Sequence, residues 1–224
     1  MRYNLIIFVF VINVSYAFGQ DFLLPIIKSN GKQIVDFIPK DWNLVDTITG
    51  DLNKDNLKDI VLVIENKNEQ HLNTDLFQHF ILIIAFRDSL NDEFKLIEQC
   101  NNLITYNQSS SGPWYEDMDI NNEIFSVSFF KGGSTDEVTH YKFRFQDNGF
   151  YLIGADRRIY NPSTQDFKDL SFNFLSKKLS ISTGNDLLNT KSKTEWQKMN
   201  FDTLMTLKSY KGPYTWEVSE DIFL

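Results

Sequence analysis

The sequence predicts a mainly β fold, an antiparallel meander sheet with one or two short helices. Residues 60–64 and 80–86 are unbroken apolar runs rich in β-branched side chains, which is typical of central strands covered on both faces. Residues 141–146 alternate aromatic and polar side chains, as a half-buried strand does. Residues 147–149 follow directly. They are expected to form a turn, because Asn and Gly accept positive φ, and the chain then returns as a hairpin.

A short helix is expected near the start of the folded region. The spacing of Ile34, Phe37 and Ile38 is helical, which places the helix within residues 31–37. Pro39 follows and ends it, since proline cannot continue a helix.

Two further strands are expected, one before and one after the second of two long loops. Residues 94–103 and 125–129 have strand-like patterns, the second alternating phenylalanine or valine with serine. The polar stretches 65–78 and 107–119 lack periodicity and are expected to be loops, which are often functional when they are this long.

The C-terminal part predicts a second hairpin. Residues 170–174 and 179–181 place apolar side chains on one face of each arm, with a turn at 176–178. Periodicity leaves open whether residues 196–207 form a helix or a strand. Sequential strands joined by short turns favour an antiparallel meander.

The first 19 residues have the pattern of a secretory signal peptide. Arg2 precedes an apolar core at 5–12, and Ala17 and Gly19 are small residues at cleavage spacing, with Ser15-Tyr16-Ala17 as an alternative site. The apolar run is shorter than the roughly 20 residues that span a bilayer, so no stable membrane insertion is expected after cleavage. The sequence therefore predicts one exported domain, residues 20–224, located in the periplasm or outside the cell.

Composition excludes some partners and chemistries. The chain carries 22 basic and 30 acidic residues, a net charge of −8, which would repel a phosphate backbone, so nucleic acid is not an expected partner. Cys100 is the single cysteine, which rules out an internal disulfide, and it is expected to be a buried small hydrophobe rather than a nucleophile.

One segment, residues 50–59, has the chemistry of a metal site. Oxygen-bearing side chains recur at alternate positions, and such a tight loop turns them toward one centre, where a hard cation such as Ca²⁺ prefers six to eight oxygen ligands. A strand is predicted directly after the loop, so the context is strand–loop–strand rather than helix–loop–helix. The candidate ligands are the side chains of Asp51, Asn53, Asp55 and Asp59 and the backbone carbonyl of Leu57.

This segment resembles the calcium loop of FG-GAP (VCBS) repeats, whose pattern is Gly-Asp-x-Asn-x-Asp-Gly-x-x-Asp before a β-strand. The resemblance implies a structural calcium site. It covers about 15 residues and occurs once, whereas FG-GAP propellers stack several such blades. Asn56 stands where the family has glycine, and asparagine tolerates the left-handed conformation less well than glycine does.

The wider layout is similar to a group of exported proteins of Bacteroidetes-like bacteria. The shared features are the lead-in Phe37-Ile38-Pro39-Lys40, the acidic loop, and the hairpin that contains 141–145 and 150–154. This similarity spans most of the mature chain. It implies a common fold and export, and it implies no activity.

A second candidate site uses aromatic and acidic residues together. Sugar-binding sites stack rings on pyranose faces and hold hydroxyls with carboxylates, and glycosidases use two carboxylates. The candidate segment is Trp114-Tyr115-Glu116-Asp117-Met118-Asp119.

Known catalytic motifs are missing from the sequence. It has no nucleophile elbow, P-loop, HExxH or dinucleotide fingerprint, and His71 and His79 lack a recognised metal spacing. The sequence therefore favours a non-enzymatic, calcium-stabilised β domain that binds an unidentified protein or glycan or supports an envelope assembly. The alternative is a carbohydrate-binding or carbohydrate-active protein that uses the 114–119 segment.

Overall fold

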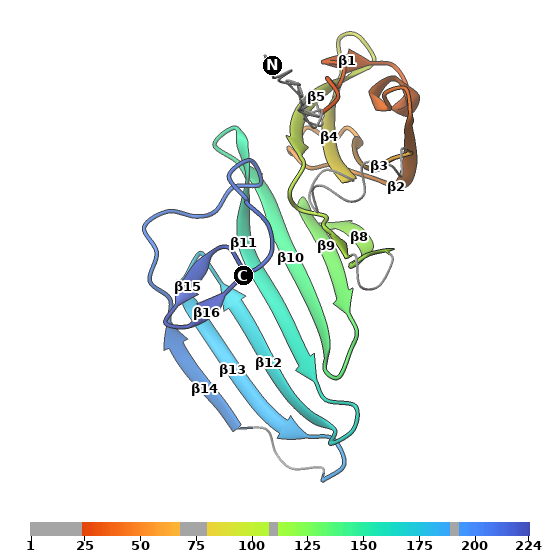
Figure 1. The fold of residues 1–224 in the computed structure, drawn as a ribbon. Helices are drawn as coiled ribbons and strands as arrows, with labels where there is room; N and C mark the ends of the chain where they lie inside the picture. Colours follow the sequence, from red (N-terminus) through yellow and green to blue (C-terminus); the bar gives the residue numbers. More distant parts are fainter. Residues whose placement is uncertain (1–23, 68–79, 108–111, 189–192) are drawn as a thin grey trace, which may run out of the picture.

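The computed structural model describes residues 24–67, 80–107, 112–188 and 193–224, and almost all regular structure in them is antiparallel β (Figure 1). The predicted mainly β meander is confirmed. One 3-10 turn, η1 (Ile34–Phe37), lies where a short helix was expected. No helix in these four ranges is long and apolar enough to cross a bilayer. The predicted signal peptide, residues 1–19, lies outside the described residues.

The N-terminal half forms a five-stranded sheet in which four strands follow sequence order. Continuous apolar runs form its two central strands, as the sequence predicts. The strands, from one edge to the other, are β1 (Asn30–Gly31), β5 (Glu93–Cys100), β4 (Phe80–Asp88), β3 (Asp59–Asn66) and β2 (Trp42–Gly50).

Both faces of β3 and β4 are covered, which explains why their sequences do not alternate with polar residues. On one face, Val61 and Ile84 belong to the main core that is shared with the second sheet. On the other, Leu62 and Ile83 pack in a smaller core with Phe37 of η1. The N-terminal segment that contains η1 therefore covers the outer face of the sheet.

The second sheet has seven strands in strict sequence order. The turn between β10 and β11 matches the expected hairpin, but its positive φ values belong to Asp147 (49°) and Asn148 (60°) rather than to Gly149. The strands are β8 (Tyr115–Asn121), β9 (Ile124–Lys131), β10 (Asp136–Gln146), β11 (Gly149–Tyr160), β12 (Asp166–Asn173), β13 (Lys178–Asn185) and β14 (Lys193–Lys198).

Several sequence-based expectations are tested by these strands. The second hairpin, β12–β13, is confirmed. The expected loop at 107–119 is wrong, because β8 begins at Tyr115 and pairs with β9 through a β-bulge near Asp117. Residues 193–198 form the edge strand β14, and the chain after it is irregular. Most of the expected loop at 65–78 lies outside the described residues.

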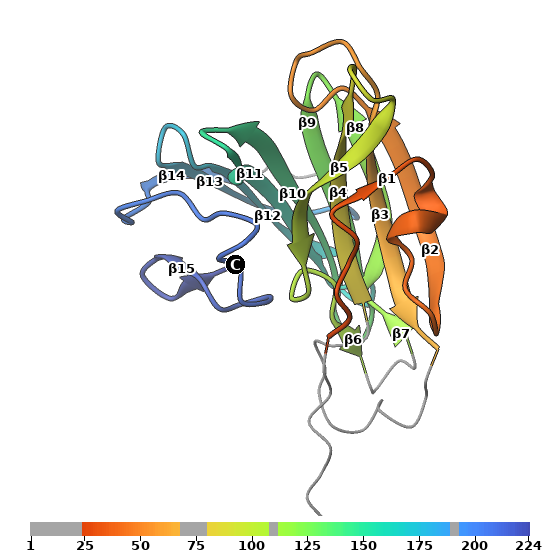
Figure 2. The ribbon, with the colours of Figure 1, turned by 90° about the horizontal axis from the view of Figure 1, so that it is seen from above.

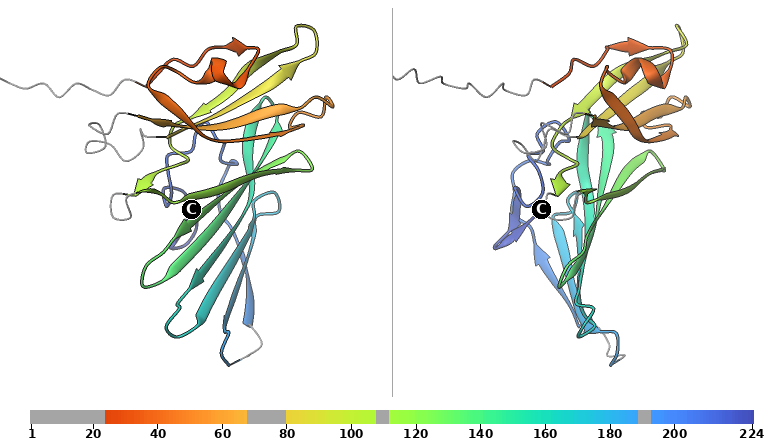
Figure 3. Two further views of the ribbon diagram at one scale, coloured as in Figure 1. Left: turned by 90° about the vertical axis from the view of Figure 1, so that its right-hand side faces the viewer. Right: turned by 45° about the vertical axis from the view of Figure 1, so that its right-hand side comes forward.

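The C-terminal segment, residues 199–224, is irregular except for one short strand pair, and it covers the inner face of the seven-stranded sheet. Figures 2 and 3 show it crossing that face beside the five-stranded sheet. Leu207, Tyr210 and Val218 are buried there, and so is the terminal Leu224. Two short strand pairs complete the fold: β6 (Tyr106–Asn107) with β7 (Gly112–Pro113), and β15 (Glu217–Ser219) with β16 (Ile222–Phe223).

Candidate functional site

One end of the inner face of the seven-stranded sheet is polar. In β10, Tyr141 and Phe143 point into the core, and period-two alternation places Thr139 and Glu137 on the same face. Arg157 of β11 lies directly opposite Thr139. An apolar face thus ends in charged and hydroxyl groups where the C-terminal segment crosses it.

These groups line a small pocket with a volume of about 20 Å³, which is room for one water-sized group. Its walls come from β9–β11 and from Trp114 just before β8, from the chain just after β5, and from the C-terminal segment, so the pocket forms only when these parts have packed together. The lining residues are Leu103, Trp114, Phe129, Lys131, Glu137, Thr139, Tyr141, Arg157, Pro213 and Tyr214.

Two residues that line this pocket each have a buried side-chain N–H donor without a hydrogen-bond acceptor. The donors are Nε1 of Trp114 and Nε of Arg157, whose residue is only 8% exposed. Arg157 Nε lies 3.2 Å from Oε1 of Glu137, which is an ion pair without hydrogen-bond geometry. A buried donor left unpaired costs about 1–3 kcal/mol, so such groups usually have a partner.

Tyr214 forms the outer wall of the pocket. Its hydroxyl donates to Oε1 of Glu137 at 2.7 Å, and Cζ of Arg157 lies 5.1 Å from its ring centre. Burial and the Glu137 carboxylate raise the pKa of the Tyr214 hydroxyl, so it stays protonated and acts as a donor. Its φ of 60° is an outlier for an aromatic residue, and such strained residues cluster at ligand sites.

Lys131 brings a second positive charge to the same wall. Its Nζ lies 4.9 Å from the centre of the Trp114 ring and 5.5 Å from that of Tyr214. Among the lining residues, the basic groups are Lys131 and Arg157, and the acidic group is Glu137. The pocket therefore has one more positive than negative charge, in a chain whose net charge is −8.

Sequence reasoning identified Trp114 but missed the other polar residues of this pocket. The sequence could have predicted that Thr139 and Glu137 face inward, because each lies an even number of residues from the inward-facing Tyr141 in the same strand. That Arg157 and Tyr214 approach them depends on strand register and on the path of the C-terminal segment, and neither can be read from local pattern.

The predicted calcium loop lies between β2 and β3 and is curled around Asp51. Oδ1 of Asp51 accepts the backbone N–H of Lys54 at 2.7 Å, and Oδ2 accepts that of Asn56 at 2.9 Å. Asn53 and Asp55 are brought together, with Nδ2 of Asn53 donating to Oδ2 of Asp55 at 2.9 Å. Asn56 has a φ of 65°, so asparagine occupies the left-handed conformation here.

Asp59 is the buried member of the candidate ligand set. Its Oδ2 accepts the backbone N–H of Leu52 at 2.8 Å, and its Oδ1 accepts that of Arg87 in β4 at 3.0 Å. Burial raises the pKa of Asp59 to about 6. The two hydrogen bonds lower this pKa, and the nearby charges of Asp55 and Asp51 raise it slightly. The Asp59 carboxylate therefore joins the loop to the sheet.

Within the described parts of the chain, no three His, Cys, Asp or Glu side chains are grouped as they would be around a metal ion. The donors of the loop are nevertheless those that a hard cation prefers, namely carboxylate and amide oxygens together with the Leu57 carbonyl.

The second candidate segment is divided by β-strand geometry. Trp114 lines the pocket, Met118 is buried, and Glu116, Asp117 and Asp119 are exposed. The segment is thus a strand whose acids lie in solvent, and the aromatic ring does not share a loop with them as the sequence suggested.

The remaining candidates are structural or untested. Cys100 is buried, as expected, and burial raises its pKa to about 11. His71 and His79 lie outside the described residues.

The fold and this site define a mainly β protein of two main antiparallel sheets with a small pocket that carries one more positive than negative charge. No protein-family model, curated protein or solved structure matches the chain.

Proposed function

We propose that this protein is an exported, non-enzymatic β module that binds a ligand in the Trp114–Tyr214 pocket. The observation that carries the proposal is that two residues lining one pocket, Trp114 and Arg157, each have a buried side-chain N–H donor without an acceptor. A ligand atom that accepts from them would remove the energetic cost of leaving both unpaired.

The chemistry of the pocket is that of recognition. Aromatic walls supply apolar contact, and a few polar groups at fixed positions supply orientation, which is the usual composition of a small-molecule site. The Glu137 carboxylate is held by Tyr214 and lies beside Arg157, so it positions other groups. The unidentified ligand is a small molecule, or a group on a protein or glycan, in the periplasm or outside the cell.

Calcium is proposed as a structural ion of this module, in line with the FG-GAP-like sequence of the loop. Asp51, Asn53, Asp55, the Leu57 carbonyl and Asp59 would hold it, and the ion would supply charge neutralisation among three carboxylates. Because Asp59 also ties the loop to β4, calcium bound there would stabilise the edge at which the two sheets meet.

Ligand-observed NMR with a library of small fragments tests the binding role. We expect Trp114→Leu to abolish the saturation-transfer signals of fragments that bind wild-type protein. Trp196→Leu is the matched control, because Trp196 is 70% exposed on the edge strand β14. Identical fragment signals from wild type and Trp114→Leu, with both proteins folded by circular dichroism, would rule out binding in this pocket.

A carbohydrate ligand remains the second candidate, because Trp114 lines the pocket and an exposed part of its ring could stack on a sugar. Neutral and acidic monosaccharides therefore belong in the same library. Signals from sugars alone, lost in Trp114→Leu, would favour this candidate.

A further inference from the structure

We infer that the Trp114–Tyr214 pocket is specific for a single carboxylate group, held between Arg157 and Lys131 with the Trp114 indole N–H as a third donor. The inference rests on the proposed binding function and adds the chemical class of the ligand. It draws on three independent features of the pocket, namely its charge, its free donors and its size.

Charge favours a monoanion. Lys131 and Arg157 contribute two positive charges, and Glu137 neutralises one of them. The positive charge that remains is the Lys131 ammonium, which lies over the Trp114 and Tyr214 rings at the exposed edge of the pocket. A carboxylate balances this charge, whereas a phosphate dianion would leave an excess of negative charge.

The free donors favour a group that only accepts hydrogen bonds. Arg157 Nε and Trp114 Nε1 donate and cannot accept, and the Lys131 ammonium has donors alone. A neutral amide would present its own N–H₂ group to part of this set. An ionised carboxylate has two oxygens and no hydrogen, and hydrogen bonds between charged groups are about twice as strong as neutral ones.

Size limits how much of the ligand enters. The cavity of about 20 Å³ accommodates one water-sized group, which suits an oxygen of a carboxylate and not a ring. The rest of the ligand would extend out of the pocket past Tyr214. This residue is 40% exposed, has a strained φ of 60° and lies in a stretch without regular structure. The ligand body would then lie against the rings of Tyr214 and Trp114.

The Trp114 indole resonance provides a direct readout. Protein labelled with ¹⁵N on its four tryptophan indoles gives one signal for each, and Trp114→Phe identifies the signal of Trp114. Acetate, benzoate and glucuronate are titrated against their neutral counterparts acetamide, benzamide and glucose at constant ionic strength. Inorganic phosphate serves as the dianion. Benzoate and glucuronate distinguish an aromatic acid from a sugar acid.

We expect a saturable shift of the Trp114 signal with at least one carboxylate and none with its neutral counterpart. Arg157→Gln should weaken binding by about tenfold or more, since it removes a charge-assisted hydrogen bond. Arg158→Gln is the matched control, because Arg158 is the next residue of β11 and is exposed on the opposite face.

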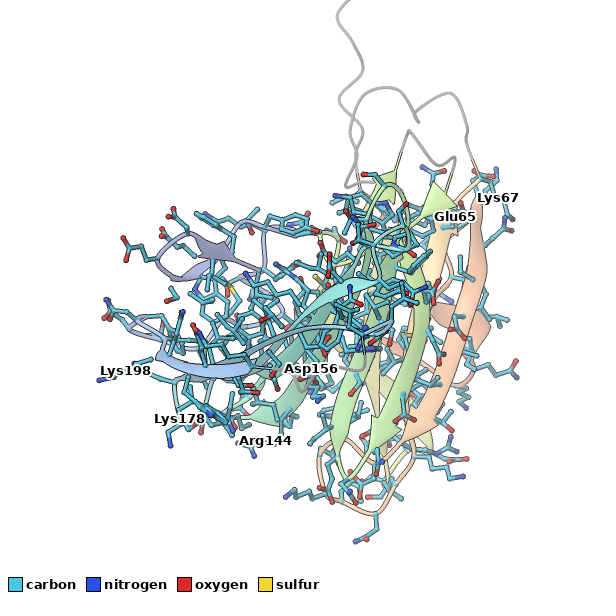
Figure 4. The ribbon with its side chains drawn as sticks, turned by 90° about the horizontal axis from the view of Figure 1, so that it is seen from below. Glu65, Lys67, Arg144, Asp156, Lys178 and Lys198 are labelled. Atoms are coloured by element: carbon cyan, nitrogen blue, oxygen red, sulfur yellow. The ribbon has the colours of Figure 1, made fainter. Side chains whose placement is uncertain are left out.

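A second pair of variants measures the same effect if Arg157→Gln does not fold. Lys131 is exposed, and Lys131→Gln should weaken carboxylate binding without unfolding the protein. Its control is Lys178→Gln, since Lys178 lies at the start of β13 (Figure 4) and is not one of the residues that line the pocket.

Three results would overturn the inference. A neutral counterpart that binds as well as its acid would show that charge is not selected, and the binding role would stand. Equal losses in Arg157→Gln and Arg158→Gln would show a general surface effect. No shift with any carboxylate would exclude this ligand class, and the fragment experiment then decides the binding role separately.

Discussion

Gly50 in β2 lies so close to Ile120 in β8 that a Cβ atom on Gly50 would stand 2.6 Å from Cγ2 of Ile120. The two sheets approach each other here, directly before the acidic loop. Gly50 is also the first residue of the acidic segment 50–59. Its φ is not positive, so the glycine is needed for close packing rather than for a turn.

Gly50→Ala is therefore expected to lower the free energy of unfolding by about 1–3 kcal/mol, the usual cost of overpacking. Gly133→Ala is the control, because the nearest atom to its added Cβ is 3.8 Å away. Chemical denaturation of both variants checks the prediction. Equal stability of the two would mean that the sheets separate at this point without cost.

Asp59→Asn is expected to destabilise the protein by about 1–3 kcal/mol even in EDTA. Both oxygens of Asp59 accept backbone N–H groups, and an amide nitrogen at either position would face a donor. Asp55→Asn is the control, since Asp55 is exposed. If the two variants melt alike in EDTA, the Asp59 carboxylate does not act as a structural link.

Calcium is expected to raise the melting temperature of the wild type and not that of Asp55→Ala. Calcium at ten times its dissociation constant would add about 1.4 kcal/mol of stability. Thermal melts in EDTA and in millimolar calcium, with magnesium as a second cation, check this. A wild-type melt that is the same with and without calcium would remove the structural ion from the proposal.

The Cys100 thiol is expected to react slowly in the native protein. Burial raises its pKa to about 11, and its Sγ donates to the carbonyl oxygen of Leu207 at 3.4 Å. At neutral pH the thiol is therefore protonated and inaccessible. Reaction with an aromatic disulfide reagent should be complete only in denaturant. Rapid stoichiometric labelling of native protein would contradict the packing of Leu207 on β5.

Asp156 is expected to contribute stability that is lost in acid. Burial alone would raise its pKa, but hydrogen bonds from Lys142 and Ser171 outweigh this effect and lower it below 3.8. The contribution is thus present above pH 3.8 and disappears as pH falls through the lower folded-state value. Because the Asp156 side chain is 39% exposed, the effect is small.

Asp156→Asn measures this effect. Its melting temperature should lie below that of the wild type at pH 7, and the two should converge as pH falls below 3.8. A difference that grows in acid would have the wrong sign.

The local sequence pattern was enough to predict strands whose residues are all buried or alternate regularly. The run at 80–86 has no polar residue because both faces of β4 are covered, and the Asp147–Asn148 turn needs two residues that accept positive φ. Pattern failed at 115–121, where a bulge interrupts the alternation of β8 and four of seven residues are exposed. An exposed, bulged edge strand has the composition of a loop.

The sequence by itself determined the β class, the hairpin turns and the acidic loop, because these depend on side-chain period and on turn residues that are adjacent in the chain. Tertiary structure decided the pocket. Trp114, Glu137, Arg157 and Tyr214 are far apart in sequence, and they meet only through the register of β9–β11 and the return of the C-terminal segment across the sheet. Long-range contacts of this kind leave no periodic signal, so only the folded chain brings the charges and free donors together.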